Sequence, residues 1–346
     1  MSLYRAPGFL FVFLLGLVAC RDSKKETAFY YWKTRYSLNE YEKKALEKMD
    51  VKRIYLRAFD VDLVDWHSKP VGVMLWKDAP QPAWDYIPVV FIRNQVLKER
   101  QYNPDQLDDE QKKGLQILAA NIWKLVRSSW QSQGLAVKEL QIDCDWTRST
   151  RMSYFYLLEA IRKEAGVPLS ATLRLHQLRD RDSCGIPPVS STVLMCYNMG
   201  NMTDIESRNS IIDHRVLQQY MKGHAVYPKS YALALPLFKW KLLFRRQKMV
   251  GIVHRLSDED LEQYFVQNKQ GLWECVQDAR VYYPDQSVMH YQKGDMIRYE
   301  RVSQTDIDSV YRFVMQQESS YNQELIYFDL DSTNLSHYDL STLPKW

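Results

Sequence analysis

Short apolar runs alternate with longer segments of helical period along most of the chain. Runs rich in aromatic and β-branched residues predict strands at residues 28–36, 53–62, 86–94, 139–146, 169–176, 192–199, 231–240 and 324–331. Apolar positions with helical spacing predict helices at residues 37–49, 104–133, 150–166, 208–223 and 305–319. Strands that alternate with helices are typical of a parallel sheet.

The number and order of these units predict an α/β fold, a (β/α)8 TIM barrel over residues 28–346. The fifth connection, residues 177–191, is too short and too rich in proline for a full helix. Residues 249–302, approximately, interrupt the alternation after strand seven with a helix-like patch and the hairpin sequence VYYPDQSVMHY. We interpret them as an α+β insertion on the barrel. An open doubly wound sheet is the competing fold, but the sequence lacks the Gly-rich phosphate loop that would support it.

The N-terminal residues resemble a secretory signal. Residues 6–19, APGFLFVFLLGLVA, form an uncharged run of signal-peptide length that is short for a membrane span. The run leads into LVAC at residues 17–20, which resembles the bacterial lipobox, a motif that is cut before its cysteine and lipidated on the thiol. The alternative is an ordinary signal peptide or membrane anchor followed by a chance cysteine. We predict a lipoprotein signal peptide at 1–19, lipidation of Cys20 and a tether at 20–27.

The residue after the cysteine bears on the location of the protein. Arg21 stands where an aspartate would signal inner-membrane retention in enterobacteria. The sequence therefore predicts a cell-envelope protein in the outer membrane of a Gram-negative bacterium, with the membrane as a partner through the lipid anchor.

Charge and cysteine spacing exclude several classes of function. Without residues 1–19, which hold one arginine and no acid, 46 − 1 = 45 basic residues face 42 acidic ones, which is no nucleic-acid signature. The four later cysteines show no metal-ligand spacing, and no nucleotide-binding fingerprint is present, so we predict neither metal nor cofactor. A disulfide is permitted outside the cytoplasm, but the sequence cannot pair these cysteines: Cys144, Cys184, Cys196 and Cys275.

Polar and aromatic residues gather at the predicted strand ends, where barrel enzymes place their active sites. Carboxylates suit sugar hydroxyl groups, and aromatic faces suit sugar rings. The alternative is that strand ends are polar because they are exposed to solvent. As substrate-binding residues we predict Asp60, Asp62, Arg93, Trp146, His176, Tyr197, Asn198, Trp240 and Asp329.

Asp143 and Asp145 are the predicted catalytic residues. They lie two positions apart near the end of the fourth strand, so their side chains are expected to point the same way, into the barrel, above Gln141. Two carboxylates so close together should raise the pKa of one of them, as in many catalytic acids. Barrels also bury acids beside arginine or lysine for structural reasons.

The segment LQIDCDWT, residues 140–147, resembles the fourth strand of glycoside hydrolase family 18, the chitinases and endo-β-N-acetylglucosaminidases. That strand ends in the pattern D-x-x-D-x-D-x-E, and Asp143 and Asp145 fall on its second and third aspartates. MCYNMGNM and ALPLFKW are similar to the family's sixth and seventh strands, and MCYNMGNM contains Tyr197 and Asn198. The resemblance implies a TIM barrel that handles glycan, with the substrate's own N-acetyl group attacking the anomeric carbon.

The chain departs from the family pattern at the general acid. Thr147 stands in place of the glutamate that protonates the glycosidic oxygen, and Leu140 replaces the first aspartate. Either another acid acts, with Asp60, Asp62, Glu274 and Asp329 as candidates, or the barrel only binds glycan. We predict a lipid-anchored, glycoside-hydrolase-like barrel that acts on or binds glycan. The alternative is a non-catalytic surface lipoprotein that binds polysaccharide or protein.

Overall fold

The computed structural model describes residues 26–98, 103, 105–222, 227–317 and 321–345. The predicted signal peptide, Cys20 and most of the predicted tether therefore lie outside the described residues. None of the helices in the described ranges is both long and apolar enough to cross a membrane.

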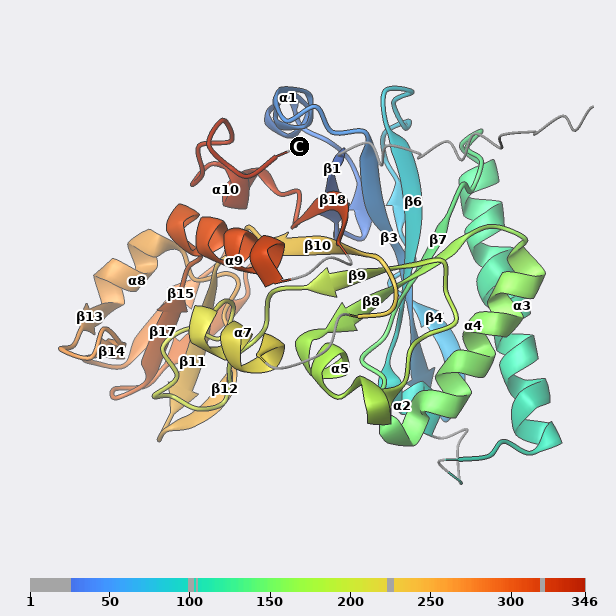
Figure 1. The fold of residues 1–346 in the computed structure, drawn as a ribbon. Coiled ribbons are helices and arrows are strands. Elements are labelled where there is room, and N and C mark those ends of the chain that lie inside the picture. The colour runs from blue at the N-terminus through green and yellow to red at the C-terminus, as the bar shows by residue number, and fades with distance from the viewer. Residues whose placement is uncertain (1–25, 99–102, 104, 223–226, 318–320, 346) are drawn as a thin grey trace, which may run out of the picture.

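Eight parallel strands form a closed barrel (Figure 1). Around the barrel their order is β1-β18-β10-β9-β8-β7-β6-β3, and pairing between β3 and β1 closes the ring. Each contains the apolar run that predicted it, so the predicted TIM barrel is confirmed. The strands are β1 (Glu26–Tyr31), β3 (Arg53–Val64), β6 (Asp85–Ile92), β7 (Leu140–Asp143), β8 (Leu169–Arg174), β9 (Ser191–Met195), β10 (Tyr231–Pro236) and β18 (Tyr321–Phe328).

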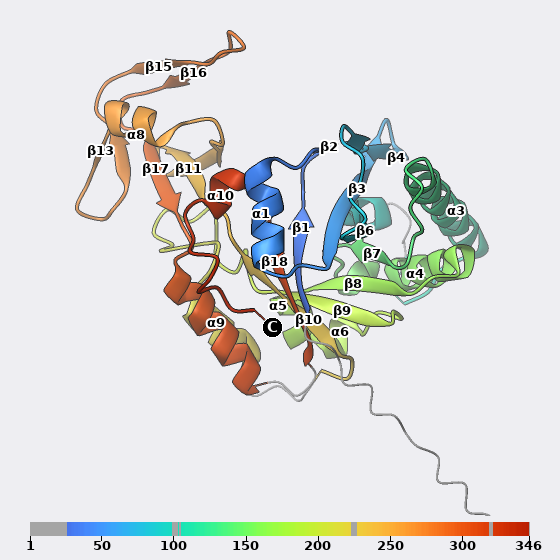
Figure 2. The ribbon, with the colours of Figure 1, turned by 90° about the horizontal axis from the view of Figure 1, so that it is seen from above.

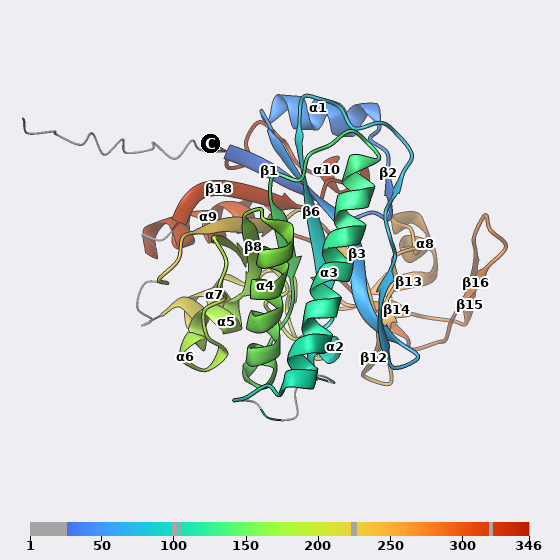
Figure 3. The same ribbon diagram turned by 90° about the vertical axis from the view of Figure 1, so that its right-hand side faces the viewer.

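Helices cover the outside of the barrel, and local capping explains where several of them begin and end. Asn39 and Asp108 each form a capping box at the start of a helix, and Gly166 in the left-handed conformation ends another. The two longest helices, α3 and α4, pack side by side (Figure 3). The helices are α1 (Glu40–Lys48), α2 (Asn94–Lys98), α3 (Asp109–Gln131), α4 (Arg151–Ala165), α5 (Leu175–Arg179), α6 (Arg181–Cys184), α7 (His214–Met221), α9 (Gln304–Gln317) and α10 (Ser332–Leu335).

Two short β segments occupy the crossover from β3 to β6. Strand β4 (His67–Val71) folds back antiparallel to the end of β3. Strand β5 (Leu75–Trp76) then pairs with β2 (Arg35–Tyr36). These segments take the place that a helix occupies in a regular β/α unit.

A second sheet lies between β10 and α9 in the chain and projects beside the barrel (Figure 2). Its strand order is β12-β11-β17-β14-β13, and it has a small apolar core of its own. It starts at Trp240, earlier than the predicted position of about 249, because the seventh barrel strand ends at Pro236. Its elements are β11 (Trp240–Arg245), β12 (Lys248–Ile252), α8 (Asp258–Tyr264), β13 (Phe265–Gln267), β14 (Trp273–Cys275) and β17 (Met296–Glu300), with the separate hairpin β15 (Ala279–Tyr282) and β16 (Val288–Tyr291).

The interior of the barrel is packed with side chains. Tyr30 and Tyr55 are buried with their ring centroids 5.3 Å apart. The Tyr30 hydroxyl donates a hydrogen bond to Gln141 Oε1 at 2.7 Å, and Gln141 Nε2 donates to Ser170 Oγ at 3.3 Å. Because these groups fill the centre of the barrel, a ligand could only be bound at its ends or outside it.

Candidate functional site

Asp143 is the last residue of β7 and lies at the carboxyl end of the barrel. Its side chain is buried, with the residue 6% exposed, and accepts a hydrogen bond from Thr172 Oγ1 at 2.6 Å. Burial and the neighbouring Asp145 carboxylate raise the pKa of Asp143 to about 6. The carboxyl group can therefore hold or release a proton near neutral pH.

Asp145 lies two residues beyond the end of β7. Its side chain is 44% exposed and accepts hydrogen bonds from Arg174 Nε at 2.6 Å and Arg174 Nη2 at 3.2 Å. Arg174 ends β8, so this ion pair joins the ends of two neighbouring strands. The structure brings Asp143 and Asp145 together, but Asp143 is buried and Asp145 faces a guanidinium group at the surface.

Tyr197 follows β9 and carries a polar group that the fold leaves unsatisfied. The residue is 4% exposed, and its hydroxyl has no hydrogen-bond partner among the described residues. Its ring stacks on Phe328 at 5.2 Å between centroids. The charges that act on the hydroxyl include Asp143, Asp329 and Arg174. A buried hydroxyl without a partner costs free energy. Neighbouring side chains cover it, so a ligand at the rim would reach it only after a side-chain rearrangement.

Asp329 follows β18 on the other side of Tyr197. Burial, with a contribution from Asp331, raises the pKa of the Asp329 carboxyl to about 6. Asn334 Nδ2 donates a hydrogen bond to it at 3.2 Å. Asp331 forms an ion pair with Lys33 at 2.9 Å and accepts hydrogen bonds from the backbone at the start of α10. The rim thus holds two carboxyl groups that titrate near neutral pH, Asp143 and Asp329.

A row of four partly buried aromatic side chains follows the rim, and we call it the rim aromatic row: Trp32, Phe328, Phe238 and Trp240. Neighbouring ring centroids are 5.5 Å apart for Trp32 and Phe328, 5.7 Å for Phe328 and Phe238, and 5.2 Å for Phe238 and Trp240. Sequence analysis identified only Trp240. The other three could have been found by their positions, because each is an aromatic residue at the end of a barrel strand or one or two residues after it.

Trp146 does not belong to the site, and its prediction as a substrate contact is wrong. The residue is 0% exposed, because its ring packs under α4 and stacks on Tyr154 at 4.8 Å between centroids. Its indole Nε1 donates a hydrogen bond to the Cys184 carbonyl at 3.0 Å. Trp146 is therefore part of the core outside the barrel.

Three of the predicted substrate-binding residues, Asp60, Asp62 and Arg93, form ion pairs within the protein. Asp60 accepts hydrogen bonds from Arg57 Nε at 2.8 Å and pairs with Arg57 Nη2 at 2.7 Å. Asp62 pairs with Arg93 Nε at 2.9 Å and accepts from Gln95 Nε2 at 2.6 Å. These side chains lie at the ends of β3 and β6, and each carboxylate has a cationic partner.

His176 and Asn198 lie beside Tyr197. The predicted fifth strand extends to residue 176, whereas the chain turns into α5 at Leu175, so His176 is helical. Burial lowers the pKa of His176. With Arg174 and Tyr197, both residues line a small hollow of about 40 Å³. Asn198 is exposed and has a left-handed backbone, with φ of 53°.

The position of the missing family 18 acid holds a hydroxyl group. Thr147 Oγ1 lies 3.0 Å from Ser149 Oγ in the turn before α4. Among the other candidate acids, Glu274 belongs to β14 of the second sheet and not to a barrel strand end. Asp329 is the remaining candidate with a raised pKa at the rim.

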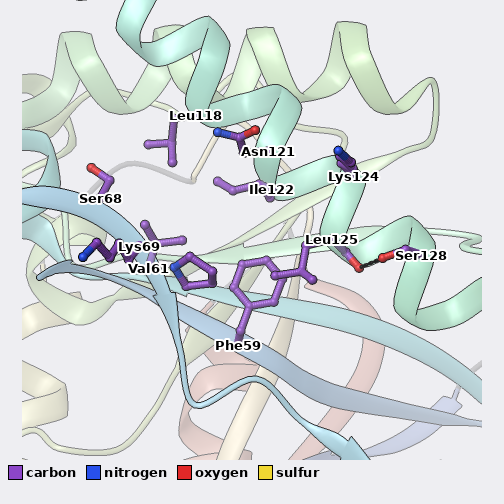
Figure 4. Close-up of a pocket in the computed structure, with 11 residues that line it drawn as sticks. Phe59, Val61, Ser68, Lys69, Leu118, Asn121, Ile122, Lys124, Leu125 and Ser128 are labelled. Carbon is purple, nitrogen blue, oxygen red and sulfur yellow. Dashed lines mark hydrogen bonds between the residues drawn. The ribbon is translucent and has the colours of Figure 1, made fainter.

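A mainly apolar hollow of about 310 Å³ lies away from the rim, between α3 and the β3–β4 hairpin (Figure 4). Phe59, Leu118 and Ile122 are among its lining residues, and no carboxylate lines it. It therefore does not coincide with the titratable groups of the rim. Two hollows with both polar and apolar lining residues lie at the rim itself, next to Lys239 and Asn334.

The four cysteines in the described part of the chain are free and buried. Burial raises the pKa of each thiol, including Cys144 beside the rim carboxylates. No group of three His, Cys, Asp or Glu side chains within the described ranges is placed to hold a metal ion.

No protein-family model matches the chain, and no curated protein matches it. Among solved structures, it is similar to the spore cortex-lytic enzyme SleL of Bacillus cereus, at 13% identity and a TM-score of 0.46, over 88% of this chain and 71% of that one. A family 18 chitinase of Cycas revoluta, solved with (GlcNAc)4, is 12% identical with a TM-score of 0.45 over 88% and 95% of the chains. A chitinase of Chromobacterium violaceum is 9% identical with a TM-score of 0.47 over 92% and 98%. The barrel fold itself follows from the strand pairing of this chain.

Replacing Asp143 with asparagine is expected to stabilise the protein at alkaline pH. The folded state raises the pKa of this carboxyl to about 6, so between about pH 4 and 6 it binds a proton that the unfolded chain has lost. Its ionisation therefore lowers stability as pH rises through that window. Asp143→Asn should add about 1–3 kcal/mol to the unfolding free energy at pH 8 and much less at pH 4.5. Urea unfolding at both pH values, with Asp62→Asn as the paired-carboxylate control, measures this. An equal gain at both pH values would contradict the expectation.

Proposed function

We propose that the chain is an extracytoplasmic, lipid-anchored protein that binds glycan at the carboxyl end of its barrel. The observation that carries the proposal is the unpartnered Tyr197 hydroxyl beside the rim aromatic row. Sugar rings pack their apolar faces on aromatic side chains, and their hydroxyl groups bond to carboxylates and phenols. The rim offers both kinds of group within one row of contacts.

Binding without hydrolysis is the function that the rim supports best. Thr147 cannot serve as a carboxylic acid, and Asp145 accepts two hydrogen bonds from Arg174, an arrangement suited to holding a ligand hydroxyl. The predicted pairing of Asp143 and Asp145 as catalytic residues stays a hypothesis.

A glycosidase is the second candidate function, and a specific observation favours it. Asp143 and Asp329 both have a pKa of about 6, which is suited to a general acid at neutral pH. In that case Asp143 or Asp329 would protonate the leaving oxygen, and Asp145 would position the substrate.

A glycan panel scored for both binding and released product tests the proposal. Wild-type protein lacking residues 1–20 would be compared with Asp145→Asn and with Lys138→Met, whose exposed side chain pairs with Asp85 at the opposite end of the barrel. We expect wild type and Lys138→Met to bind at least one glycan without releasing product, and Asp145→Asn to bind it more weakly. Product that disappears in Asp143→Asn or Asp329→Asn would establish the second candidate. The absence of both binding and product would contradict the proposal and favour a protein partner.

The lipid anchor is a separate part of the proposal, supported by the LVAC sequence at residues 17–20. Full-length protein expressed in a Gram-negative host should incorporate labelled palmitate and fractionate with the outer membrane. Cys20→Ser should lose both the label and the fractionation. A wild-type protein that stays unlabelled would show that Cys20 is not lipidated.

A further inference from the structure

Two hollows that share lining residues lie beside the rim, lined by residues from the ends of the barrel strands and from the second sheet. Their volumes are about 300 and 360 Å³, and they share Lys239 and Asn334 as lining residues. Trp240 and Phe238 of the rim aromatic row line them as well. We call the two together the rim groove. Asn334 also donates to the Asp329 carboxyl, so the groove borders the proposed glycan site.

Three cations in the groove converge on a single carboxylate, Asp258. Lys241 is buried and lies 2.5 Å from it, Lys239 lies 3.3 Å away, and Arg301 lies 3.8 Å away. Tyr299 also donates a hydrogen bond to Asp258 at 3.0 Å. Although burial alone would raise the pKa of Asp258, these hydrogen bonds lower it, so the carboxylate stays ionised. One negative charge therefore faces three positive ones.

The charge of Lys241 alone is enough to neutralise Asp258, which leaves Lys239 and Arg301 in surplus. Asp331, a carboxylate that lines the groove, shares Lys33 with Glu42. The four cations Lys33, Lys239, Lys241 and Arg301 therefore face the three carboxylates Glu42, Asp258 and Asp331, which leaves a net positive charge at the groove. Lys239 Nζ lies 2.8 Å from His337 Nε2, a geometry in which a neutral imidazole accepts the hydrogen bond. Burial, together with Lys239 and Arg301, lowers the pKa of His337, as expected where positive charge is in excess.

Lys239 and Arg301 both lie near the face of the Tyr299 ring, which is partly exposed. Arg301 lies over the Tyr299 ring at 4.1 Å from the centroid, and Lys239 lies 5.8 Å from the same centroid. Trp240 is held in place by a hydrogen bond from its indole Nε1 to Glu300 at 2.6 Å. A sugar ring placed on Trp240 or Phe238 would bring a substituent close to Lys239 and Arg301.

We propose that the rim groove binds an anionic group of the glycan, a carboxylate or a sulfate, through Lys239 and Arg301. This inference rests on the proposed function and names the class of ligand: acidic polysaccharide. An uncharged glycan would leave Lys239 and Arg301 sharing Asp258, a carboxylate that Lys241 already neutralises. An acidic one supplies charge-assisted hydrogen bonds there, which gives selectivity for charge.

Three oligosaccharides test the inference by calorimetry: tetragalacturonate, its matched fully methyl-esterified form and a κ-carrageenan tetrasaccharide. The ester keeps the sugar backbone of the galacturonate and removes the charge, whereas the carrageenan carries sulfate on a different sugar backbone. Wild type should bind at least one anionic oligosaccharide about ten-fold more tightly than the ester, a difference typical of a charge-assisted contact. Binding of the galacturonate but not its ester identifies a carboxylate as the bound group, and binding of the carrageenan identifies a sulfated glycan as a ligand.

Two double variants, each of which removes two positive charges, distinguish binding in the groove from attraction by the overall charge of the protein. Lys239→Met with Arg301→Met should remove the preference for the acidic form, whereas Lys138→Met with Lys52→Met, at exposed pairs outside the groove, should keep it. Equal binding of acid and ester by wild type, or equal losses in both double variants, would overturn the inference. So would failure to bind either anionic oligosaccharide. The proposed function fails only if the uncharged glycans of the panel are unbound as well.

Discussion

Glu300→Ala is expected to destabilise the protein by about 3–5 kcal/mol, because it leaves the buried Arg298 without its carboxylate partner. Glu300 is 2% exposed and lies 2.6 Å from Arg298 Nε. Its other oxygen accepts hydrogen bonds from the Ser210 backbone at 2.9 Å, the Ser210 hydroxyl at 2.6 Å and the Trp240 indole at 2.6 Å. Removing the carboxylate therefore removes both hydrogen bonds from Ser210 to the second sheet and frees the side chain of Trp240.

Arg298 makes the loss larger than that of an ordinary hydrogen bond. Its guanidinium also donates to the backbone carbonyls of Asp204, Asn201 and Met202, so it cannot turn to solvent without breaking the loop. Urea unfolding of Glu300→Ala measures the loss. Replacing both Arg298 and Glu300 with methionine should recover much of it, because no unpaired charge is left buried. A loss below about 1 kcal/mol in Glu300→Ala would show that the pair is hydrated.

Trp146→Ala is expected to lower the unfolding free energy by a similar amount, about 3–5 kcal/mol. The substitution leaves a cavity beside Tyr154 and removes the donor to the Cys184 carbonyl at 3.0 Å. Trp146→Phe keeps most of the ring volume and loses the hydrogen bond, so its cost should be about 1–2 kcal/mol. Chemical unfolding of the two variants separates the cavity from the hydrogen bond.

The same pair of variants tests whether Trp146 is structural. Trp146→Phe, at a temperature where it is folded, should bind glycan as wild type does, because the buried ring cannot reach a ligand at the rim. Weaker binding by a fully folded Trp146→Phe would show that the ring takes part in recognition.

The barrel could be predicted because its strands are buried on both sides. A parallel barrel strand is apolar almost throughout, so each run stands out from the amphipathic helices that follow it. The ends of strands were less certain. The chain turns into helix at Leu175 and leaves β7 at Asp143, and neither change alters the local polarity pattern. This placed His176 on a strand, and it extended the fourth strand past Asp143 to include Asp145.

The site was only partly predictable, because it is assembled from distant parts of the chain. The presence of carboxylates at strand ends predicted Asp143 and Asp329 as site residues, and the fold brings both to one rim around Tyr197. The contact between Trp32 and Phe328 joins the first and the last strand of the barrel and has no local sequence signal. Trp146 shows the converse case, since the aromatic residue that follows the fourth strand is buried by α4.

The most direct measurement of the central claim is the affinity of the tightest-binding panel glycan for Trp32→Ala, compared with wild type and Tyr282→Ala. Trp32 belongs to the rim aromatic row, whereas Tyr282 lies in the β15–β16 hairpin and is 70% exposed. We predict that Trp32→Ala weakens binding about ten-fold, which corresponds to about 1.4 kcal/mol, and that Tyr282→Ala leaves it unchanged. Unchanged affinity in a folded Trp32→Ala, or a larger loss in Tyr282→Ala, would contradict a glycan site at the carboxyl end of the barrel.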